Sequence, residues 1–281
     1  MGIFNKNRKD AKWIKPKDGI AAIMPYIMNK RVDAEVSSQL LIDVTNLCNF
    51  VDNQNKKGNL EYKMTYFHAL TACLGMTIFN RDALNRFVKN KRLYQRNKIT
   101  FAFVAKDKMS DNAEEKLICL DLDPNETGLE LSHKMAVDIF KVRKEGTNNM
   151  NDILKFFTSM PKWLLSIIIG VVKILDKHGL SPKAITEGDT NHATVILSNL
   201  GSIGTSSCYH HLTDYGTNSI VLTIGTIRKE NNKRIVDICA TIDERIADGF
   251  YFAKSMQLFE YIAKNPELLN EKLAKTIEIN K

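Results

Sequence analysis

Hydrophobic and polar residues alternate along residues 235–242, in the last quarter of the chain. One face of this stretch carries apolar residues at every second position: Val236, Ile238, Ala240 and Ile242. The opposite face carries Ile235 and Cys239. A period of two with apolar residues on both faces is typical of a strand that is covered on both sides. The pattern therefore predicts a buried β-strand over 235–242.

Immediately downstream the apolar residues change to helical spacing. They recur at Phe252, Met256, Phe259 and Ala263, and Asn265-Pro266 ends the pattern. The connection from strand to helix is Asp243-Glu244-Arg245-Ile246-Ala247-Asp248-Gly249, which holds four charged side chains. An isolated buried charge costs several kcal/mol, so we expect these charges to be paired. Arg245 has both Asp243 and Asp248 within reach of the same turn.

The same patterns predict further elements along the chain. Strands are expected at 40–44, 99–105, 116–122, 194–198 and 220–227, with a hairpin around Asn90-Lys91. Helices are expected at 46–57, 65–78, 127–144 and 267–281. Residues 1–20 are basic and are broken by Pro16 and Gly19. We therefore expect an irregular lead-in over 1–20, followed by one domain over 21–281.

A very apolar segment lies in the second half of the chain, from Trp163 to Val172, and is interrupted only by Ser166 and Gly170. A membrane-spanning helix needs about 20 apolar residues, which is twice the length of this run. We interpret it as part of an apolar helical insertion near 153–177. A buried helix at a subunit contact is the favoured interpretation. The alternatives are a lid over an apolar substrate channel and peripheral membrane contact through residues 163–175.

Composition narrows the classes of function. The 281 residues are 44% hydrophobic and carry a formal net charge of +8, so the chain is able to build a large core and favours anionic partners. Basic residues are dense only over 81–98, where Phe87 and Tyr94 are the only rings, so nucleic acid is not an expected partner. The five cysteines form no Cys-x-x-Cys pair and no signal peptide is visible, which favours a reducing, cytoplasmic location.

The turn over 243–249 resembles a pattern found in dihydrolipoyl acyltransferases, the core subunits of 2-oxo acid dehydrogenase complexes. These proteins carry Asp-His-Arg-x-x-Asp-Gly between a strand and a helix near the C-terminus, and chloramphenicol acetyltransferases carry a related His-x-x-x-Asp-Gly. Four residues match the first pattern: Asp243, Arg245, Asp248 and Gly249. Glu244 occupies the position of the catalytic histidine of that family.

Two other segments extend the resemblance to residues 32–269. The segment Asp43-Val44-Thr45-Asn46-Leu47 is similar to Asp-Val-Thr-x-Leu of the family, and Ser198-Asn199-Leu200-Gly201 is similar to its Ser-Asn-Leu-Gly. The resemblance implies an α/β (α+β) two-layer sandwich of the chloramphenicol acetyltransferase type, in which helices cover a mixed sheet. It also implies a homotrimer whose sites lie between subunits, with coenzyme A entering from one side and a small-molecule acyl acceptor from the other. No metal and no covalent lipoyl group are expected.

Carried over residue by residue, the resemblance assigns roles within that site. Ser198 would donate a hydrogen bond to the oxyanion, and Glu244 would occupy the position of the base. Asp243, Arg245, Asp248 and Gly249 would hold the turn in place. Asn199 and Gly201 would contact coenzyme A. The basic hairpin residues Arg86, Lys91 and Arg92 would hold its phosphates, although a solvated basic hairpin is an equally good interpretation of these three.

The glutamate at the histidine position leaves the activity open. An ordinary glutamate carboxylate is a weak base at neutral pH because its pKa is about 4.3, and burial raises such a pKa. His210 and His211 are alternative bases, and His192 is a third. The other class of function is a catalytically inactive member of the fold, which uses the same trimer for binding or scaffolding.

Overall fold

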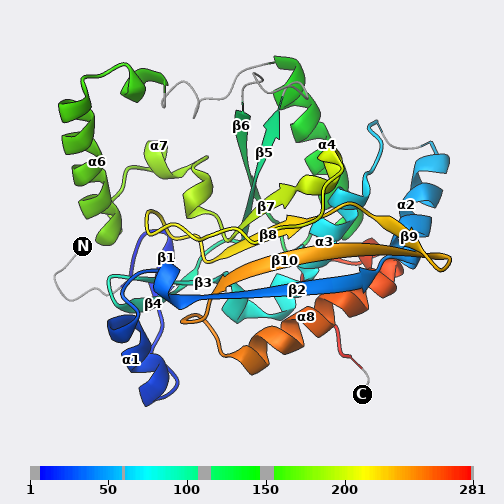
Figure 1. Ribbon diagram of the computed structural model, residues 1–281, viewed down its shortest axis with the longest axis horizontal. Helices are drawn as coiled ribbons and strands as arrows, with labels where there is room; N and C mark the ends of the chain where they lie inside the picture. Colours follow the sequence, from blue (N-terminus) through cyan, green and yellow to red (C-terminus); the bar gives the residue numbers. More distant parts are fainter. Residues whose placement is uncertain (1–6, 59–60, 107–114, 146–154, 280–281) are drawn as a thin grey trace.

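A mixed sheet forms the centre of the molecule (Figure 1). The computed structural model describes residues 7–58, 61–106, 115–145 and 155–279. The main sheet follows the order β2 (Glu35–Asp43), β10 (Lys233–Asp243), β8 (Ile220–Ile224), β7 (Val195–Asn199), β5 (Thr100–Lys106) and β6 (Glu115–Asp121), and β9 (Arg228–Glu230) also pairs with β10. The β5–β7 and β7–β8 pairs are parallel and the other pairs are antiparallel. The predicted mixed sheet is therefore confirmed.

Four helices form a second layer on one face of this sheet (Figure 1). They are α2 (Thr45–Lys56), α3 (Tyr66–Asn80), α4 (Gly128–Glu145) and α8 (Gly249–Lys264). The hydrophobic core lies between the two layers, and α3 contributes a continuous run of buried residues from Phe67 to Ile78. The predicted sandwich of a mixed sheet and covering helices is confirmed. Residues 205–217 run along the opposite face, where Ser207 and Cys208 hydrogen-bond to Asp237 and Thr223.

A small second sheet changes the expectation for the first twenty residues. It contains β1 (Ala11–Trp13), β4 (Arg92–Arg96) and β3 (Arg86–Lys89), in that order. The lead-in is therefore not irregular throughout, because β1 pairs with β4 and Ala11 is fully buried. The predicted hairpin is confirmed, since Asn90 and Lys91 both adopt the positive φ angles of a tight two-residue turn between β3 and β4.

The apolar segment forms α6 (Lys162–Lys177), which stands at one edge of the molecule together with α1 (Gly19–Ile27) and the short helix α7 (Lys183–Thr186) (Figure 1). Within one chain α6 is not buried, because Trp163 is 66% exposed and Ile174 is 61% exposed. Residues 153 and 154 of the predicted insertion lie outside the described residues. No helix that the structure describes has both the length and the apolar character to cross a membrane.

The C-terminal tail departs from the predicted surface helix. A 3₁₀ helix covers only Pro266–Asn270, and the described residues beyond it form no regular helix. Leu269 and Leu273 are fully buried and belong to the main core. The tail is therefore anchored by apolar packing rather than by helical hydrogen bonds.

Candidate active site

The turn that joins β10 to α8 is held by a buried ion pair. Asp243 is fully buried and accepts hydrogen bonds from Nε and Nη2 of Arg245, at 2.8 and 2.7 Å. The remaining terminal nitrogen of Arg245 donates to the backbone oxygen of Met28 at 2.7 Å. The pair therefore ties the end of β10 to the segment that follows α1, which is the pairing that the buried charges required.

A second arginine approaches the same carboxylate from the segment between α1 and β2. Arg31 is 2% exposed, and its Nε lies 3.9 Å from Asp243 Oδ2. Its other nitrogens donate to the backbone oxygens of Thr213 and Val88. Burial lowers the pKa of Arg31, the charge of Asp243 counteracts this, and the neighbouring Arg245 lowers the pKa further. Two arginines thus share one aspartate, and this part of the molecule is rich in positive charge.

Asp248 does not pair with Arg245, in contrast to the prediction. Its Oδ1 accepts a hydrogen bond from the backbone of Tyr251 at 2.8 Å, which caps the first turn of α8, and its Oδ2 pairs with Lys17. Hydrogen bonds from the Lys17 ammonium and from the Tyr251 backbone lower the pKa of Asp248. Gly249 begins α8, and a Cβ atom added there would meet no atom within 4 Å. The four matching residues therefore do lie in one turn, but they form two separate sets of contacts.

Glu244 differs from the other charged residues of this turn in the contacts of its side chain. It is partly exposed, and its backbone N–H donates to Ala34 O at 2.9 Å. None of the described residues forms a hydrogen bond or ion pair with its carboxylate. His210 and His211 reach the same end of the sheet, because the next residue, Leu212, hydrogen-bonds to the Glu35 side chain, and Glu35 is the ladder partner of Asp243. Both histidines are exposed and their rings stack at 4.8 Å.

Ser198 lies at the carboxyl end of β7, on the wall of a pocket of about 920 Å³. Asn199 and Gly201 line the same pocket, as the resemblance implied. The Asn199 side chain accepts a hydrogen bond from the backbone of Ser202 at 3.2 Å and so begins the short 3₁₀ helix Leu200–Ile203. This local bond holds the loop after β7 against the pocket.

A close approach of two backbones forms the floor under this loop. A Cβ atom added to Gly201 would lie 2.6 Å from the carbonyl oxygen of Gly225. A Cβ atom added to Gly225 would lie 2.6 Å from both the Asp237 carboxylate and the backbone nitrogen of Ser207. Burial raises the pKa of Asp237, but hydrogen bonds from Ser207 and the charge of Arg228 outweigh it and lower this pKa overall. Both glycines are therefore required by the space available.

Other residues of this pocket were not singled out by the sequence. Tyr62 and Phe140 form part of its wall, with ring centroids 4.4 Å apart, and Lys63 is the only lysine or arginine among the described residues that line it. His68 also lines the pocket, but it is 5% exposed and accepts a hydrogen bond from the backbone of Thr65, as expected of a core histidine. The only available signal was the position of Tyr62 and Lys63 in a connection between two helices, where binding residues often lie.

One chain does not bring Ser198 and Glu244 together. Ser198 is level with Thr223 on β8 and with Cys239 on β10. Glu244 lies five residues beyond Cys239, which corresponds to about 17 Å along a strand, and two strand spacings add about 10 Å sideways. The two candidate catalytic residues therefore lie at opposite ends of the sheet.

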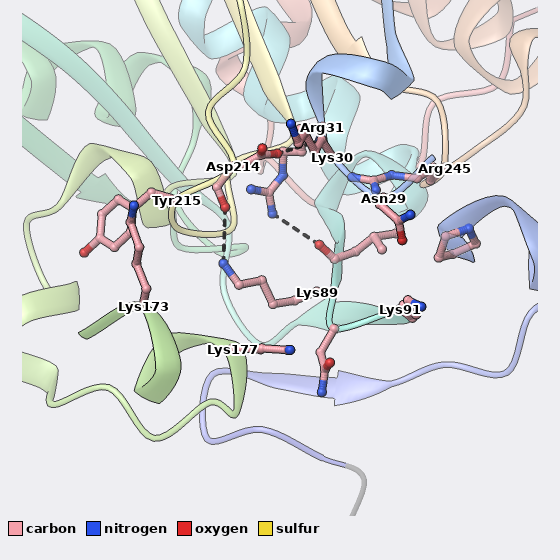
Figure 2. Close-up of a pocket in the computed structure, with 13 residues that line it drawn as sticks. Asn29, Lys30, Arg31, Lys89, Lys91, Lys173, Lys177, Asp214, Tyr215 and Arg245 are labelled. Atoms are coloured by element: carbon pink, nitrogen blue, oxygen red, sulfur yellow. Dashed lines mark hydrogen bonds between the residues drawn. The ribbon is translucent and has the colours of Figure 1, made fainter. Parts of the chain in front are cut away.

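The basic hairpin residues also lie away from the Ser198 pocket. Arg86 pairs with Asp82 at 3.0 Å and donates to Gln95, while Arg92 is exposed on β4. Lys91 lines a different pocket of about 420 Å³, together with Arg31 and Arg245 (Figure 2). None of the three lines the pocket that contains Ser198.

His192, the third alternative base, is part of a buried cluster of charged residues. Its Nε2 lies 3.3 Å from Asp176 and its Nδ1 lies 2.9 Å from Asp189. Burial lowers the pKa of His192, but the two carboxylates more than offset this and the pKa is raised overall. Lys89 and Arg8 also pair with Asp176, which is fully buried. Burial raises the pKa of Asp176, but the hydrogen bond with His192 and the charge of Lys89 outweigh it and hold this pKa below its usual range.

Comparison with known proteins shows where this sheet with its layer of covering helices is also found. No protein-family model and no curated protein matches the sequence. Solved structures match over most of the chain. A probable dihydrolipoamide acetyltransferase from Listeria monocytogenes superposes with a TM-score of 0.57 at 14% identity, over 90% of this chain and 94% of that one.

Two further structures place the fold in the same group. The dihydrolipoamide acetyltransferase of Azotobacter vinelandii, studied for a serine, a histidine and an asparagine in its catalytic mechanism, has a TM-score of 0.58 at 12% identity, over 90% of this chain and 89% of that one. A chloramphenicol acetyltransferase has a TM-score of 0.56 at 10% identity, over 91% of this chain and 98% of that one. The predicted fold of these proteins is therefore confirmed.

Proposed function

We propose that this protein is an acyltransferase, which moves an acyl group between coenzyme A and an acceptor at a site shared by two copies of a homotrimer. The observation that carries the proposal is the position of Ser198 on the wall of a large pocket at one end of the sheet, with Glu244 uncommitted at the other end. A head-to-tail contact between copies brings unlike ends together, and three such contacts close a ring.

Ser198 is suited to stabilise the charge that develops on the thioester oxygen. The strand ladder fixes the backbone of Ser198 at the end of β7, and a positioned hydroxyl donor is worth most in a site that excludes water. The Azotobacter enzyme likewise has a serine in its catalytic mechanism. Lys63 gives the same pocket a positive charge for a phosphate of coenzyme A, a role that the sequence had assigned to the hairpin.

Glu244 is suited to accept the proton of the attacking nucleophile. Each of the three guanidinium nitrogens of its neighbour Arg245 donates a hydrogen bond to Asp243 or to Met28 O, and none pairs with the Glu244 carboxylate in the described part of the chain. Packing of a second copy against the turn would remove water from the carboxylate, and a carboxylate out of water is a stronger base. Glu244 thus takes the place of the histidine of the acetyltransferases.

The edge of the main sheet offers a surface for assembly. β2 pairs with β10 on one side, and no described strand pairs with its other side. Val36 and Leu41 on this strand are 44% and 65% exposed. An uncovered edge strand with apolar side chains favours association with another chain. Light scattering during size-exclusion chromatography would measure the mass, and a monomer at all concentrations would contradict the trimer.

Release of free thiol from acetyl-coenzyme A, with a panel of small acceptors, tests the activity. We expect Ser198→Ala to lower kcat about 100-fold, as removal of an oxyanion donor does. We expect Glu244→Gln to lower it by about 100-fold or more, as loss of a general base does. Ser206→Ala and Glu267→Gln are matched controls, because both side chains are exposed and neither lines the pocket.

Mixed trimers test whether the site is shared. Copies that carry Ser198→Ala and copies that carry Glu244→Gln would be unfolded together and refolded at equal amounts. About a quarter of the head-to-tail contacts then join an intact serine to an intact glutamate, so about a quarter of the wild-type rate should return. No recovery in verified mixed trimers would contradict a site formed between copies.

A catalytically inactive trimer is the second candidate, and the glutamate at the histidine position is the observation that favours it. This alternative predicts background thiol release from the wild type and from both variants. It also predicts that coenzyme A, or another ligand of the pocket, raises the melting temperature of the wild type without turnover.

A further inference from the structure

A pocket of about 420 Å³ lies between α1, the β3–β4 hairpin and α6, and its lining is strongly cationic (Figure 2). The cations that line it are Lys30, Arg31, Lys89, Lys91, Lys173, Lys177 and Arg245. Asp214 is the one carboxylate among the described lining residues. This excess of positive charge in a concave surface indicates a site for an anion.

The cations of this lysine pocket divide into an inner and an outer set. The inner set, Arg31, Lys89 and Arg245, already binds carboxylates or backbone oxygens of the protein. The outer set is Lys30, Lys91, Lys173 and Lys177, and none of its ammonium groups forms an ion pair with a described residue. Lys91 lies 4.9 Å from the ring centre of Tyr26. Four lysines therefore remain available around the opening for a ligand.

The helix that supplies two of these lysines also exposes an apolar stripe. Trp163, Ile167, Val171 and Ile174 recur at helical spacing and are 50–66% exposed. Lys173 and Lys177 lie beside this stripe at a spacing of four residues, so one side of α6 is apolar and its border is basic. The single acidic residue of α6, Asp176, is buried on the side facing the protein. Every exposed charge of α6 is therefore a lysine.

The other helix beside the pocket has the same character. α1 exposes Ile20, Ile23 and Ile27 at a spacing of three to four residues, by 74, 53 and 65%. Pro25 of α1 lines the pocket, and so does Lys30 just beyond its end. Two helices with exposed apolar residues thus lie at the edge of the molecule that contains the lysine-lined opening (Figure 1).

We propose that this edge binds the surface of an anionic phospholipid bilayer, with a headgroup phosphate in the lysine pocket and the apolar faces of α1 and α6 in the interfacial region. Helices with an apolar face and a lysine border bind membranes in this way, and each lysine near the surface adds to the affinity. Charge favours this occupant over a second copy that presents the same edge, because lysines would then face lysines. The proposal does not depend on acyl transfer.

Sedimentation with vesicles tests it directly. Wild-type protein would be mixed with vesicles of phosphatidylcholine and with vesicles that also contain phosphatidylglycerol. We expect at least about tenfold stronger binding to the anionic vesicles, decreasing as salt is raised. Equal binding to both kinds of vesicle, or to neither, would overturn the proposal.

Matched variants locate the contact. Lys173→Gln/Lys177→Gln should weaken binding to anionic vesicles about tenfold or more. Lys56→Gln/Lys57→Gln makes the same change in net charge on α2, at the far end of the molecule (Figure 1), and should leave binding within about twofold of the wild type. Equal losses in both double variants would show that only net charge matters and would overturn the proposed site. All four lysines are exposed, and a thermal melt would confirm that each variant folds.

Further measurements test the contribution of apolar residues to vesicle binding and the binding of competing ligands. Trp163→Ala should weaken vesicle binding severalfold, and the Trp163 environment should become more apolar on binding, with a blue shift of its fluorescence. Trp163 fluorescence unchanged by anionic vesicles would contradict contact through α6. Inorganic phosphate or an RNA oligonucleotide that binds with the same lysine dependence, when vesicles do not bind, would also overturn the membrane proposal.

Discussion

The two ends of the main sheet are built on different physical principles. At the end that carries Ser198, backbone contact between two glycines and apolar walls shape a large pocket, and charged side chains are few. At the other end, Asp243, Arg245 and Arg31 are buried together, and their mutual charges and hydrogen bonds fix the turn before α8. Steric fit between backbones shapes the first end, and the pairing of buried charges shapes the second.

This difference explains why the resemblance around the turn is not by itself evidence of catalytic activity. Asp243 and Arg245 connect β10 to the segment after α1, and Asp248 caps α8, so each of them has a structural reason to be present. A chain without activity would need them equally. Among the charged residues of the turn, only Glu244 has a side chain without such a structural role. A function of the turn therefore depends on Glu244, the position that departs from the family pattern.

The largest effect is expected from Asp243→Ala at the charged end. Removal of this carboxylate leaves Arg245 and Arg31 buried without their shared partner, and such a loss typically costs about 3–5 kcal/mol of the free energy of unfolding. Urea denaturation followed by circular dichroism measures it. Asp248→Ala is the matched control, because it removes a helix cap and an exposed ion pair and should cost only about 1 kcal/mol. Equal losses of the free energy of unfolding in the two variants would contradict stabilisation of the turn by its buried charges.

A smaller effect is expected from Gly225→Ala at the pocket end. The added methyl group would lie 2.6 Å from the backbone nitrogen of Ser207, so the loop beside the pocket must move, and overpacking of this kind costs about 1–3 kcal/mol. Gly170→Ala in α6 is the control, since a methyl group there meets no atom within 4 Å and improves helix propensity by about 1 kcal/mol. If both substitutions had the same effect, the close approach of backbones would not be what shapes the pocket.

Features encoded by neighbouring residues could be predicted from the sequence. The alternation before Asp243 and the helical spacing after Gly249 gave β10 and α8, because each pattern lies within one element. The hairpin at Asn90 followed from a tight turn of two polar residues, and the cap at Thr65 lies where the helix was predicted to begin. The helix predicted at 46–57 begins one residue earlier, at Thr45, whose hydroxyl donates to Asp43.

Features that depend on contacts between distant residues could not be predicted in this way. The pairing of Lys17 with Asp248 joins residues 231 positions apart, and β1 exists only because β4 provides its partner. The separation of Ser198 from Glu244 needs the order and direction of the strands, which no local pattern contains. The partner of α6 could not be predicted either, because an apolar sequence shows that a helix packs in a nonpolar environment but not which molecule supplies it.

The smallest effect is expected from pH, and it concerns the charged end, where a histidine and two aspartates form a cluster. The pKa of His192 is raised by Asp176 and Asp189, so its contribution to stability is fully present below its ordinary pKa of about 6.5 and is lost as pH rises through the higher folded value. The pKa values of Asp176 and Asp189 are lowered, so their contribution is present above about 3.8 and is lost as pH falls below it. Stability from this cluster is therefore greatest between these limits.

His192→Gln tests this assignment. The variant should be less stable than the wild type at pH 6, and the difference should shrink as pH rises above 7, because the wild type then loses the charged imidazole while glutamine does not titrate. Urea denaturation at several pH values between 5 and 9 gives both curves. His178→Gln is the control, since His178 is exposed and forms no ion pair with a described residue, and its curve should run parallel to that of the wild type. A difference between wild type and His192→Gln that stays constant over this range would show that His192 acts through packing alone, and the charged end would then owe its stability to Asp243 and its arginines.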